Sequence, residues 1–175
     1  MKTQKLTVKD LALCALFAAV TAICAWISLP VLQIAFTMQT FAIFLVLFTL
    51  GGRRGTISIL VYLLLGAVNL PVFSGFKGGM SAILGITGGY IWGFLLSGLA
   101  YWLITAKLGE KFAIPAAAVG LVVCYACGTA WFVCISGTYT WWSALSICVL
   151  PYIIPDCVKI ALAWVLSRRL ARFAN

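Results

Sequence analysis

Charged residues are scarce in this chain of 175 residues: they make up 9% of it, and three of them are acidic. Hydrophobic residues make up 65%, whereas a soluble globular domain is roughly 45–50% apolar and about 25% charged. A soluble fold of this length has too little interior to bury so much apolar surface. The composition therefore excludes an ordinary soluble domain and predicts a protein that lies in the lipid bilayer.

Histidine is absent from the sequence. Its absence removes the commonest general base and, with it, the His-dependent catalytic triads. The pattern G-x-x-x-x-G-K-[ST] is also absent, so the chain itself is not expected to hydrolyse ATP. We therefore expect a protein that is not an enzyme and that needs no cofactor.

Two of the seven cysteines, Cys124 and Cys127, form a C-x-x-C sequence. That spacing can indicate a metal site or redox chemistry, but no second C-x-x-C and no histidine accompany it. All seven cysteines lie in apolar runs, where cysteine packs as a small hydrophobe. We expect structural thiols and no metal site.

Long hydrophobic runs dominate what is present. A membrane-spanning helix needs about 20 largely apolar residues, and the runs predict six such helices in an all-α membrane protein with a single domain over residues 1–175. The expected spans are approximately 8–29, 36–50, 56–70, 88–105, 114–135 and a last helix from Pro155 to about Arg169.

The net charge of +9 could indicate a nucleic-acid partner, but the basic residues form short clusters between the apolar runs. If the N-terminus is cytoplasmic, the inner segments hold ten of the twelve basic residues, and the outer loops hold Lys77. The positive-inside rule favours this topology, with both termini cytoplasmic. The ten are Lys2, Lys5, Lys9, Arg53, Arg54, Lys107, Lys111, Arg168, Arg169 and Arg172. We expect a lipid bilayer and no nucleic acid as the partner of this surface.

Two segments break the helical pattern. Residues 72–89 contain six glycines but are too apolar for a free linker, and non-helical backbone at membrane depth must be buried in protein or line a cavity. We expect a lid or re-entrant loop over an outer pocket; the alternative is a connector with no ligand.

Farther on, Pro151 and Pro155 should not share one regular helix. We therefore expect a short outer helix at 141–149, a turn, and a last helix that begins near Pro155.

Asp156 and Lys159 lie in the last apolar run, three residues apart and so on one helix face. An ionisable pair inside a membrane segment is costly and is by default a functional hypothesis, although it could instead be a structural ion pair. A carboxylate accepts and an ammonium donates hydrogen bonds, so the pair matches a neutral ligand with N–H groups beside a carbonyl. A cyclic urea, a lactam, an imide or a nucleobase edge would fit equally well.

Four motifs resemble the BioY family, the biotin-specific substrate-binding (S) components of energy-coupling factor transporters. Residues 61–80 read VYLLLGAVNLPVFSGFKGGM and residues 84–94 read LGITGGYIWGF. The first-loop motif is similar to FTMQTF at 36–41, and the sixth-helix motif is similar to PYIIPDCVK at 151–159. The sequence departs from the family pattern at Ile154 and Pro155, where the family commonly has Pro and then Gly.

The resemblance implies six helices, a prokaryotic cytoplasmic membrane and high-affinity binding of biotin as the transported ligand. It implies that Asp156 and Lys159 contact the biotin head group, under loops around Gln39 and Gly78. Tyr90, Gln39, Phe76 and Lys77 are further candidate ligand-binding residues. Lys77 could meet the valerate carboxylate of biotin or could equally be a solvated loop residue.

The resemblance also implies partners, namely a transmembrane coupling protein and two ATPase subunits. Small residues permit close helix packing, and Ala15, Ala18, Ala19 and Ala22 are the candidate partner face; packing within the chain's own bundle is the alternative. Other functions stay open: an S component for another vitamin, with Trp26, Tyr90 and Trp92 against a flat ring, a stand-alone biotin transporter, a lipid-modifying membrane enzyme, or a structural scaffold.

Overall fold

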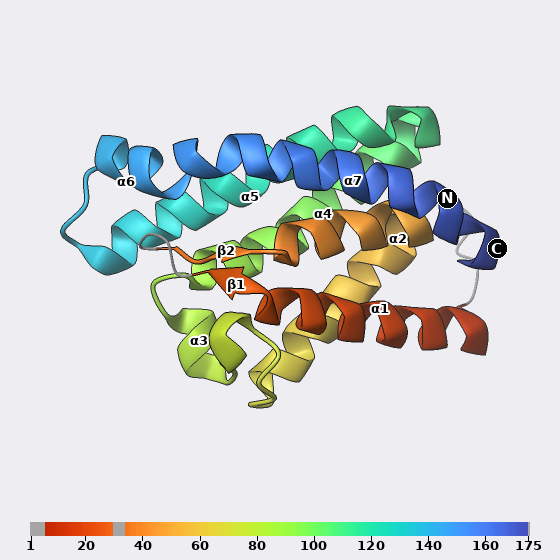
Figure 1. Cartoon of the computed structure of the whole chain (residues 1–175), viewed down its shortest axis with the longest axis horizontal. Helices are drawn as coiled ribbons and strands as arrows, with labels where there is room; N and C mark the ends of the chain where they lie inside the picture. The colour runs from red at the N-terminus through yellow and green to blue at the C-terminus, as the bar shows by residue number, and fades with distance from the viewer. Residues whose placement is uncertain (1–5, 30–33, 175) are drawn as a thin grey trace.

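The computed structural model describes residues 6–29 and 34–174, with side chains described as far as residue 170. Lys2, Lys5 and the side chain of Arg172, which the charge argument used, lie outside the described residues. Long helices run along the long axis of the molecule (Figure 1). They are α1 (Val8–Trp26), α2 (Gln39–Ala67), α4 (Gly88–Leu108), α5 (Ala113–Ser136) and α7 (Leu150–Ala174).

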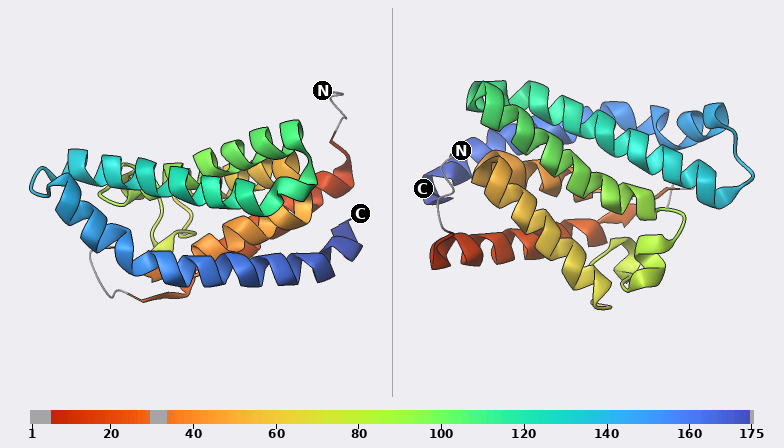
Figure 2. Two further views of the ribbon diagram at one scale, coloured as in Figure 1. Left: turned by 90° about the horizontal axis from the view of Figure 1, so that it is seen from above. Right: turned by 180° about the vertical axis from the view of Figure 1, so that it is seen from behind.

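Short elements connect these helices. They are β1 (Ser28–Leu29), β2 (Phe36–Thr37), η1 (Ser74–Phe76), α3 (Met80–Leu84), η2 (Glu110–Phe112) and α6 (Trp141–Cys148). The two strands pair antiparallel, with Ser28 opposite Thr37 and Leu29 opposite Phe36. Helix α2 packs against α1, α4 and α7, and α4 packs against α5. Figure 2 shows α2 between the α4–α5 pair and α7, so α2 is the central element of the bundle.

The two spans expected at 36–50 and 56–70 both lie in α2. The backbone leaves the helical conformation at Gly51, with φ of 77°, which glycine adopts without steric cost because it has no Cβ. Next to it, a Cβ on Gly52 would come 2.6 Å from the Cα of Trp102 on α4. The chain reverses at this point, so α2 consists of two arms (Figure 1). Within the described residues, five helices are long and apolar enough to cross a membrane, where six were expected.

The prediction that the last helix begins at Pro155 is wrong. Helix α7 begins at Leu150, and both prolines lie in it. Pro151 is in the first turn, where backbone N–H groups have no helical acceptor, so its missing N–H costs no hydrogen bond. Pro155 is one turn farther on and removes a single bond, to the carbonyl of Pro151. The short outer helix was predicted closely, since α6 begins at Trp141, after Thr140 caps it through the amide of Ser143.

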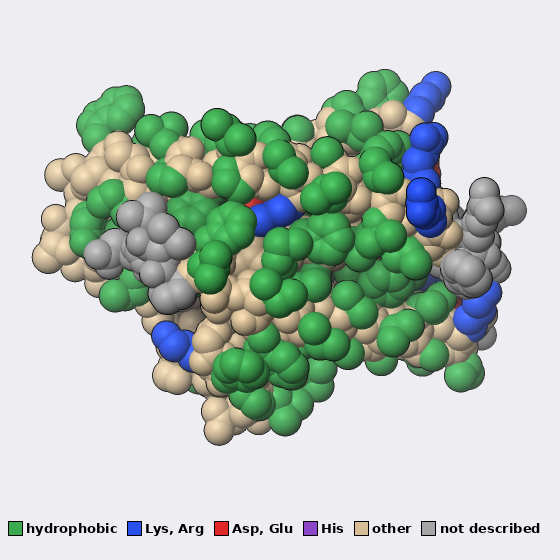
Figure 3. Space-filling model, in the orientation of Figure 1, with side chains coloured by type: hydrophobic (Ala, Val, Ile, Leu, Met, Phe, Trp, Pro, Cys, Tyr) green, Lys and Arg blue, Asp and Glu red, His purple; other side chains and the backbone are tan. Residues whose placement is uncertain are grey.

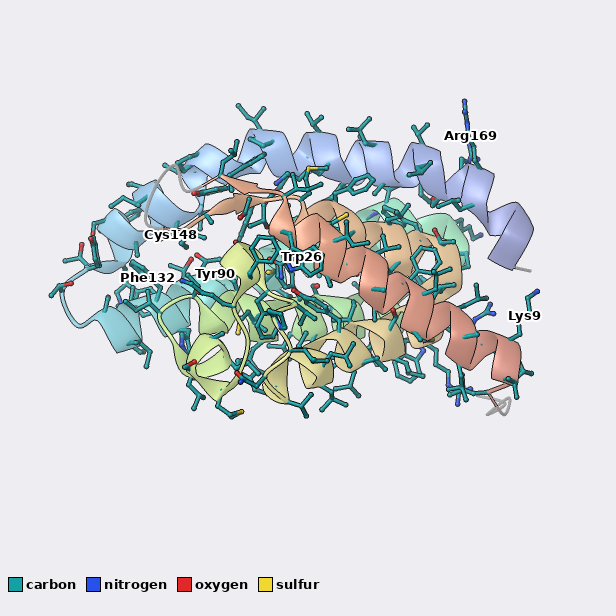
Figure 4. All side chains as sticks on the ribbon, turned by 60° about the horizontal axis from the view of Figure 1, so that its bottom comes forward. Lys9, Trp26, Tyr90, Phe132, Cys148 and Arg169 are labelled. Atoms are coloured by element: carbon teal, nitrogen blue, oxygen red, sulfur yellow. The ribbon has the colours of Figure 1, made fainter. Side chains whose placement is uncertain are left out.

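The surface is as apolar as the composition requires. Exposed leucine, isoleucine, valine and tryptophan side chains include Trp142, which is 81% exposed, and apolar side chains cover much of the face in Figure 3. Basic side chains gather at one end of that face. Lys9 and Arg169 both lie at this end (Figure 4), where α1 begins and α7 ends. A broad apolar surface with a basic end is the arrangement of a membrane protein with one basic side.

Candidate ligand-binding site

A cavity of about 750 Å³ lies among β2, the start of α2, the segment 73–87 and helices α4, α5, α6 and α7. This volume falls within the range of small-molecule sites, roughly 300–1,000 Å³. In Figure 4, Tyr90 and Cys148, which line the cavity, lie toward the end of the molecule opposite Lys9 and Arg169. Residues of the glycine-rich segment line the same cavity; its action as a lid stays a prediction.

Asp156 and Lys159 line this cavity. Lys159 Nζ lies 2.8 Å from Asp156 Oδ1, and each residue is only 4% exposed. The pairing follows from helix geometry, because both residues are on α7 three positions apart. Withdrawing two charges from water costs several kcal/mol per ion unless further hydrogen bonds satisfy them.

Those further bonds are present. The hydroxyl of Tyr125 donates to Asp156 Oδ2 at 2.7 Å. Lys159 Nζ donates to the main-chain oxygen of Thr37 at 2.8 Å and lies 3.8 Å from the centroid of the Phe36 ring. The carboxylate still has lone pairs for further donors, because its two oxygens have about four acceptor positions between them. The pair is therefore stabilised in place and can still accept hydrogen bonds from a ligand.

Gln39 and Tyr90, two of the other predicted ligand-binding residues, also line the cavity. Gln39 Nε2 donates to the hydroxyl of Tyr62 at 2.6 Å, and that hydroxyl donates to the main-chain oxygen of Val72. Gln39 thus contacts the tyrosine of α2 that is bonded to the start of the glycine-rich segment. The Tyr90 hydroxyl lies 3.3 Å from Thr129 Oγ1, so α4 and α5 are linked beside the cavity.

Lys77 and Phe76 are neighbours in the chain but differ in position. Lys77 lines the cavity and is exposed. Phe76 does not line the cavity; its ring stacks on Trp26 with a centroid separation of 5.1 Å, and the residue is 65% exposed. Trp26 Nε1 also donates to the main-chain oxygen of Pro71. The structure therefore places Phe76 in a contact that holds the segment against α1, outside the lining of the cavity.

Comparison with known proteins agrees with this arrangement. The model of the BioY family matches residues 1–175. The chain belongs to the BioY family. BioY proteins are transporter components, so the match agrees with the expectation that the chain is not an enzyme.

Two relatives extend over nearly the whole chain. The biotin transporter BioY of Thermotoga maritima is 36% identical over 90% of this chain and 92% of its own length. A protein named "Probable biotin transporter BioY" from Pyrococcus horikoshii is 39% identical over 93% of this chain and 96% of its own length. The fold resembles the crystal structure of the S-component for biotin from an ECF-type ABC transporter, with a TM-score of 0.85, 25% sequence identity and coverage of 96% of this chain and 95% of that one.

Three residues of this BioY site were not among the predicted ligand-binding residues. Tyr125 contacts Asp156 from α5, and Phe36 and Thr37 contact Lys159 from β2. Phe36 and Thr37 belong to the first-loop motif at 36–41, which was the available signal for them. Tyr125 lies in an apolar run, between Cys124 and Cys127, and the C-x-x-C spacing gives no signal that distinguishes it from a core tyrosine. Cys148 lines the cavity as well; burial raises the pKa of its thiol, which favours the neutral form there.

The predicted partner face of BioY helix α1 is divided. Ala18 and Ala22 are buried, at 0% and 6% exposure, and pack inside the chain's own bundle. Ala15 and Ala19 are exposed. The four alanines therefore do not form one exposed face: Ala18 and Ala22, four residues apart, lie on the face that packs in the core, and Ala15 and Ala19 lie on the neighbouring exposed face. Ala15 and Ala19 alone remain available to a partner.

Proposed function

We propose that this chain is the biotin-binding S component of an energy-coupling factor transporter in the cytoplasmic membrane of a prokaryote. The observation that carries the proposal is the buried pair of Asp156 and Lys159 at 2.8 Å in the wall of a cavity of about 750 Å³. The names of the relatives and of the similar solved structure support biotin as the ligand. No cofactor is needed for this function.

The cyclic urea of biotin matches the polar end of the cavity. One of its two N–H groups donates to a free lone pair of Asp156, beside the urea carbonyl. Its carbonyl needs a donor, and Lys159 has three N–H groups, directed toward Asp156, the oxygen of Thr37 and the ring of Phe36. The biotin carbonyl therefore accepts one of these N–H groups of Lys159. It does so either in place of the main-chain oxygen of Thr37 or in place of the Phe36 ring. Lys77, which lines the cavity and is exposed, is the cation that meets the valerate carboxylate.

The membrane topology follows from the two arms of α2. If each arm crosses the bilayer, the chain crosses it six times and both termini face the same side. The basic end with Lys9 and Arg169 then faces the cytoplasm, and the cavity opens to the outside. That orientation suits capture of a scarce vitamin before it enters the cell.

Uptake on this proposal requires other subunits. The chain has no phosphate-binding loop of the G-x-x-x-x-G-K-[ST] type, so the energy comes from a transmembrane coupling protein and two ATPase subunits. The exposed face of α1 with Ala15 and Ala19 is the proposed contact, because small side chains let another helix approach closely.

Biotin binding to the purified full-length chain in detergent tests the proposal. We expect tight binding by the wild type and a loss of at least one hundredfold in Asp156→Asn and in Lys159→Ala, since each leaves a buried polar partner unpaired. Glu110→Gln and Lys107→Ala are matched controls, because they remove the same charges from exposed positions outside the cavity. A folded wild type that does not bind biotin would overturn the proposal.

A further inference from the structure

Tyr125 lies on α5 and bridges the cavity wall to α7. Its hydroxyl donates to Asp156 Oδ2 at 2.7 Å, while Asp156 Oδ1 accepts from Lys159 at 2.8 Å. The carboxylate is thus held through both of its oxygens, by one partner on its own helix and one on a different helix. Tyr125 and Asp156 both line the cavity, so this hydrogen bond lies where a ligand would bind.

The contacts with Lys159 and Tyr125 together fix the orientation of the Asp156 carboxylate, which one contact alone would leave free to rotate. The terminal torsion of an aspartate is broad and is not confined to staggered wells, so a carboxylate held by Lys159 alone can turn about its own axis. With Oδ2 held by Tyr125, the plane of the carboxylate is set. The lone pairs that neither partner uses then have a fixed direction.

The same bond determines the polarity of Tyr125. A phenol has one proton, and here that proton points at Asp156. The phenol oxygen can therefore accept but has no proton left to donate to a ligand. Together, Tyr125 and Asp156 present acceptors to the cavity, and the donor is Lys159 on the other side of the carboxylate.

We propose that Tyr125 is a positioning residue that orients the Asp156 carboxylate, so that the site selects for the one ureido N–H group that faces this carboxylate. This inference rests on the proposed biotin-binding function and assigns the discrimination of the urea group to a residue outside the Asp156–Lys159 pair. The hydroxyl acts through Asp156, and its loss leaves the aromatic ring in place.

The experiment compares two ligand types in two variants. Binding of biotin and of its two mono-N-methyl ureido isomers is measured for wild type, Tyr125→Phe and Tyr139→Phe in detergent. We expect Tyr125→Phe to bind biotin roughly tenfold or more weakly, the size of a lost hydrogen bond to a charged group. We expect a smaller loss for the N-methyl isomer in which the methyl group replaces the N–H that Asp156 accepts, because that isomer cannot use the oriented lone pair. Tyr139 does not line the cavity, so its variant controls for loss of a tyrosine hydroxyl.

Three results contradict the inference while leaving the proposed function intact. Biotin affinity in Tyr125→Phe could equal that of the wild type, or the affinities for biotin and both isomers could fall by the same factor, which would mean that Tyr125 only shapes the cavity. Tyr139→Phe could also lose as much as Tyr125→Phe. By contrast, a wild type that does not bind biotin overturns the proposed function itself.

A second pair of variants covers the case in which Tyr125→Phe does not fold. Tyr125→Gln and Tyr125→Met have side chains of similar size, but only glutamine can donate an N–H to Asp156. We expect the glutamine variant to bind biotin more tightly than the methionine variant and to discriminate more strongly against the N-methyl isomer that lacks the N–H facing Asp156. Equal affinities and equal discrimination in the two variants would overturn the inference.

Discussion

Lys159 donates a hydrogen bond of 2.8 Å to the main-chain oxygen of Thr37, a residue 122 positions earlier in the chain. The ammonium thereby joins the last helix to β2 and lies over the ring of Phe36. Because the same ammonium pairs with Asp156, one charged group holds the wall of the cavity together and also forms part of its recognition surface.

The Asp156–Lys159 pair should show strong coupling in stability as well as in binding. Lys159→Met leaves the buried carboxylate without its counter-ion and should lower the free energy of unfolding by about 3–5 kcal/mol. Asp156→Asn combined with Lys159→Met removes both charges and should recover much of that loss. Thermal unfolding in detergent without biotin measures both variants. Additive losses in the double variant would contradict a directly paired, buried interaction.

Lys77 should recognise the carboxylate of biotin and not its ring. Lys77→Gln should weaken biotin binding about three- to tenfold, a modest factor because the ammonium is exposed and screened by water. The same substitution should leave the binding of biotinamide, in which a neutral amide replaces the carboxylate, at its wild-type affinity. Titrations of both ligands at low salt make the comparison, with Lys107→Gln as the control. An equal effect on the two ligands would show that Lys77 does not contact the carboxylate.

The glycine-rich segment should lose its position over the cavity when Gly78 acquires a side chain. A Cβ on Gly78 would lie 2.2 Å from the main-chain oxygen of Leu70, so the backbone must move. Gly78→Ala should weaken biotin binding at least about tenfold, which corresponds to a loss of about 1.4 kcal/mol of binding free energy. Gly137→Ala is the control: it meets no atom within 4 Å, although its φ of +65° adds local strain. Unchanged affinity in Gly78→Ala would mean that the segment does not contribute to the site.

The two faces of α1 should respond differently to large side chains. Ala18 is fully buried, and Ala18→Leu should destabilise the fold by about 1–3 kcal/mol through overpacking. Ala15→Leu, on the exposed face, should leave stability and biotin binding unchanged but should reduce biotin uptake in cells that contain the coupling protein and the ATPase subunits. Binding and uptake are measured on the same variants. If Ala15→Leu leaves uptake intact, the partner contact lies elsewhere.

Much of this protein could be predicted from its sequence because the responsible signals are local. The apolar runs and the clustered basic residues indicate membrane helices with one basic side. The pairing of Asp156 with Lys159 was also predictable, since a spacing of three on one helix brings two side chains together whatever the rest of the fold does. The prediction failed for Pro155, where the helix tolerates the loss of a single hydrogen bond.

The tertiary structure decided the remainder. Tyr125 reaches Asp156 from 31 positions away and Thr37 reaches Lys159 from 122 positions away, and no local pattern encodes contacts of that separation. Ala18 and Ala19 are adjacent and identical in the sequence, yet one is buried and the other exposed. Lipid solvates apolar side chains as readily as a protein core does. In a membrane helix, therefore, hydrophobicity alone does not distinguish the face that packs inward from the face that meets lipid or a partner, and only the packing of the helices determines it.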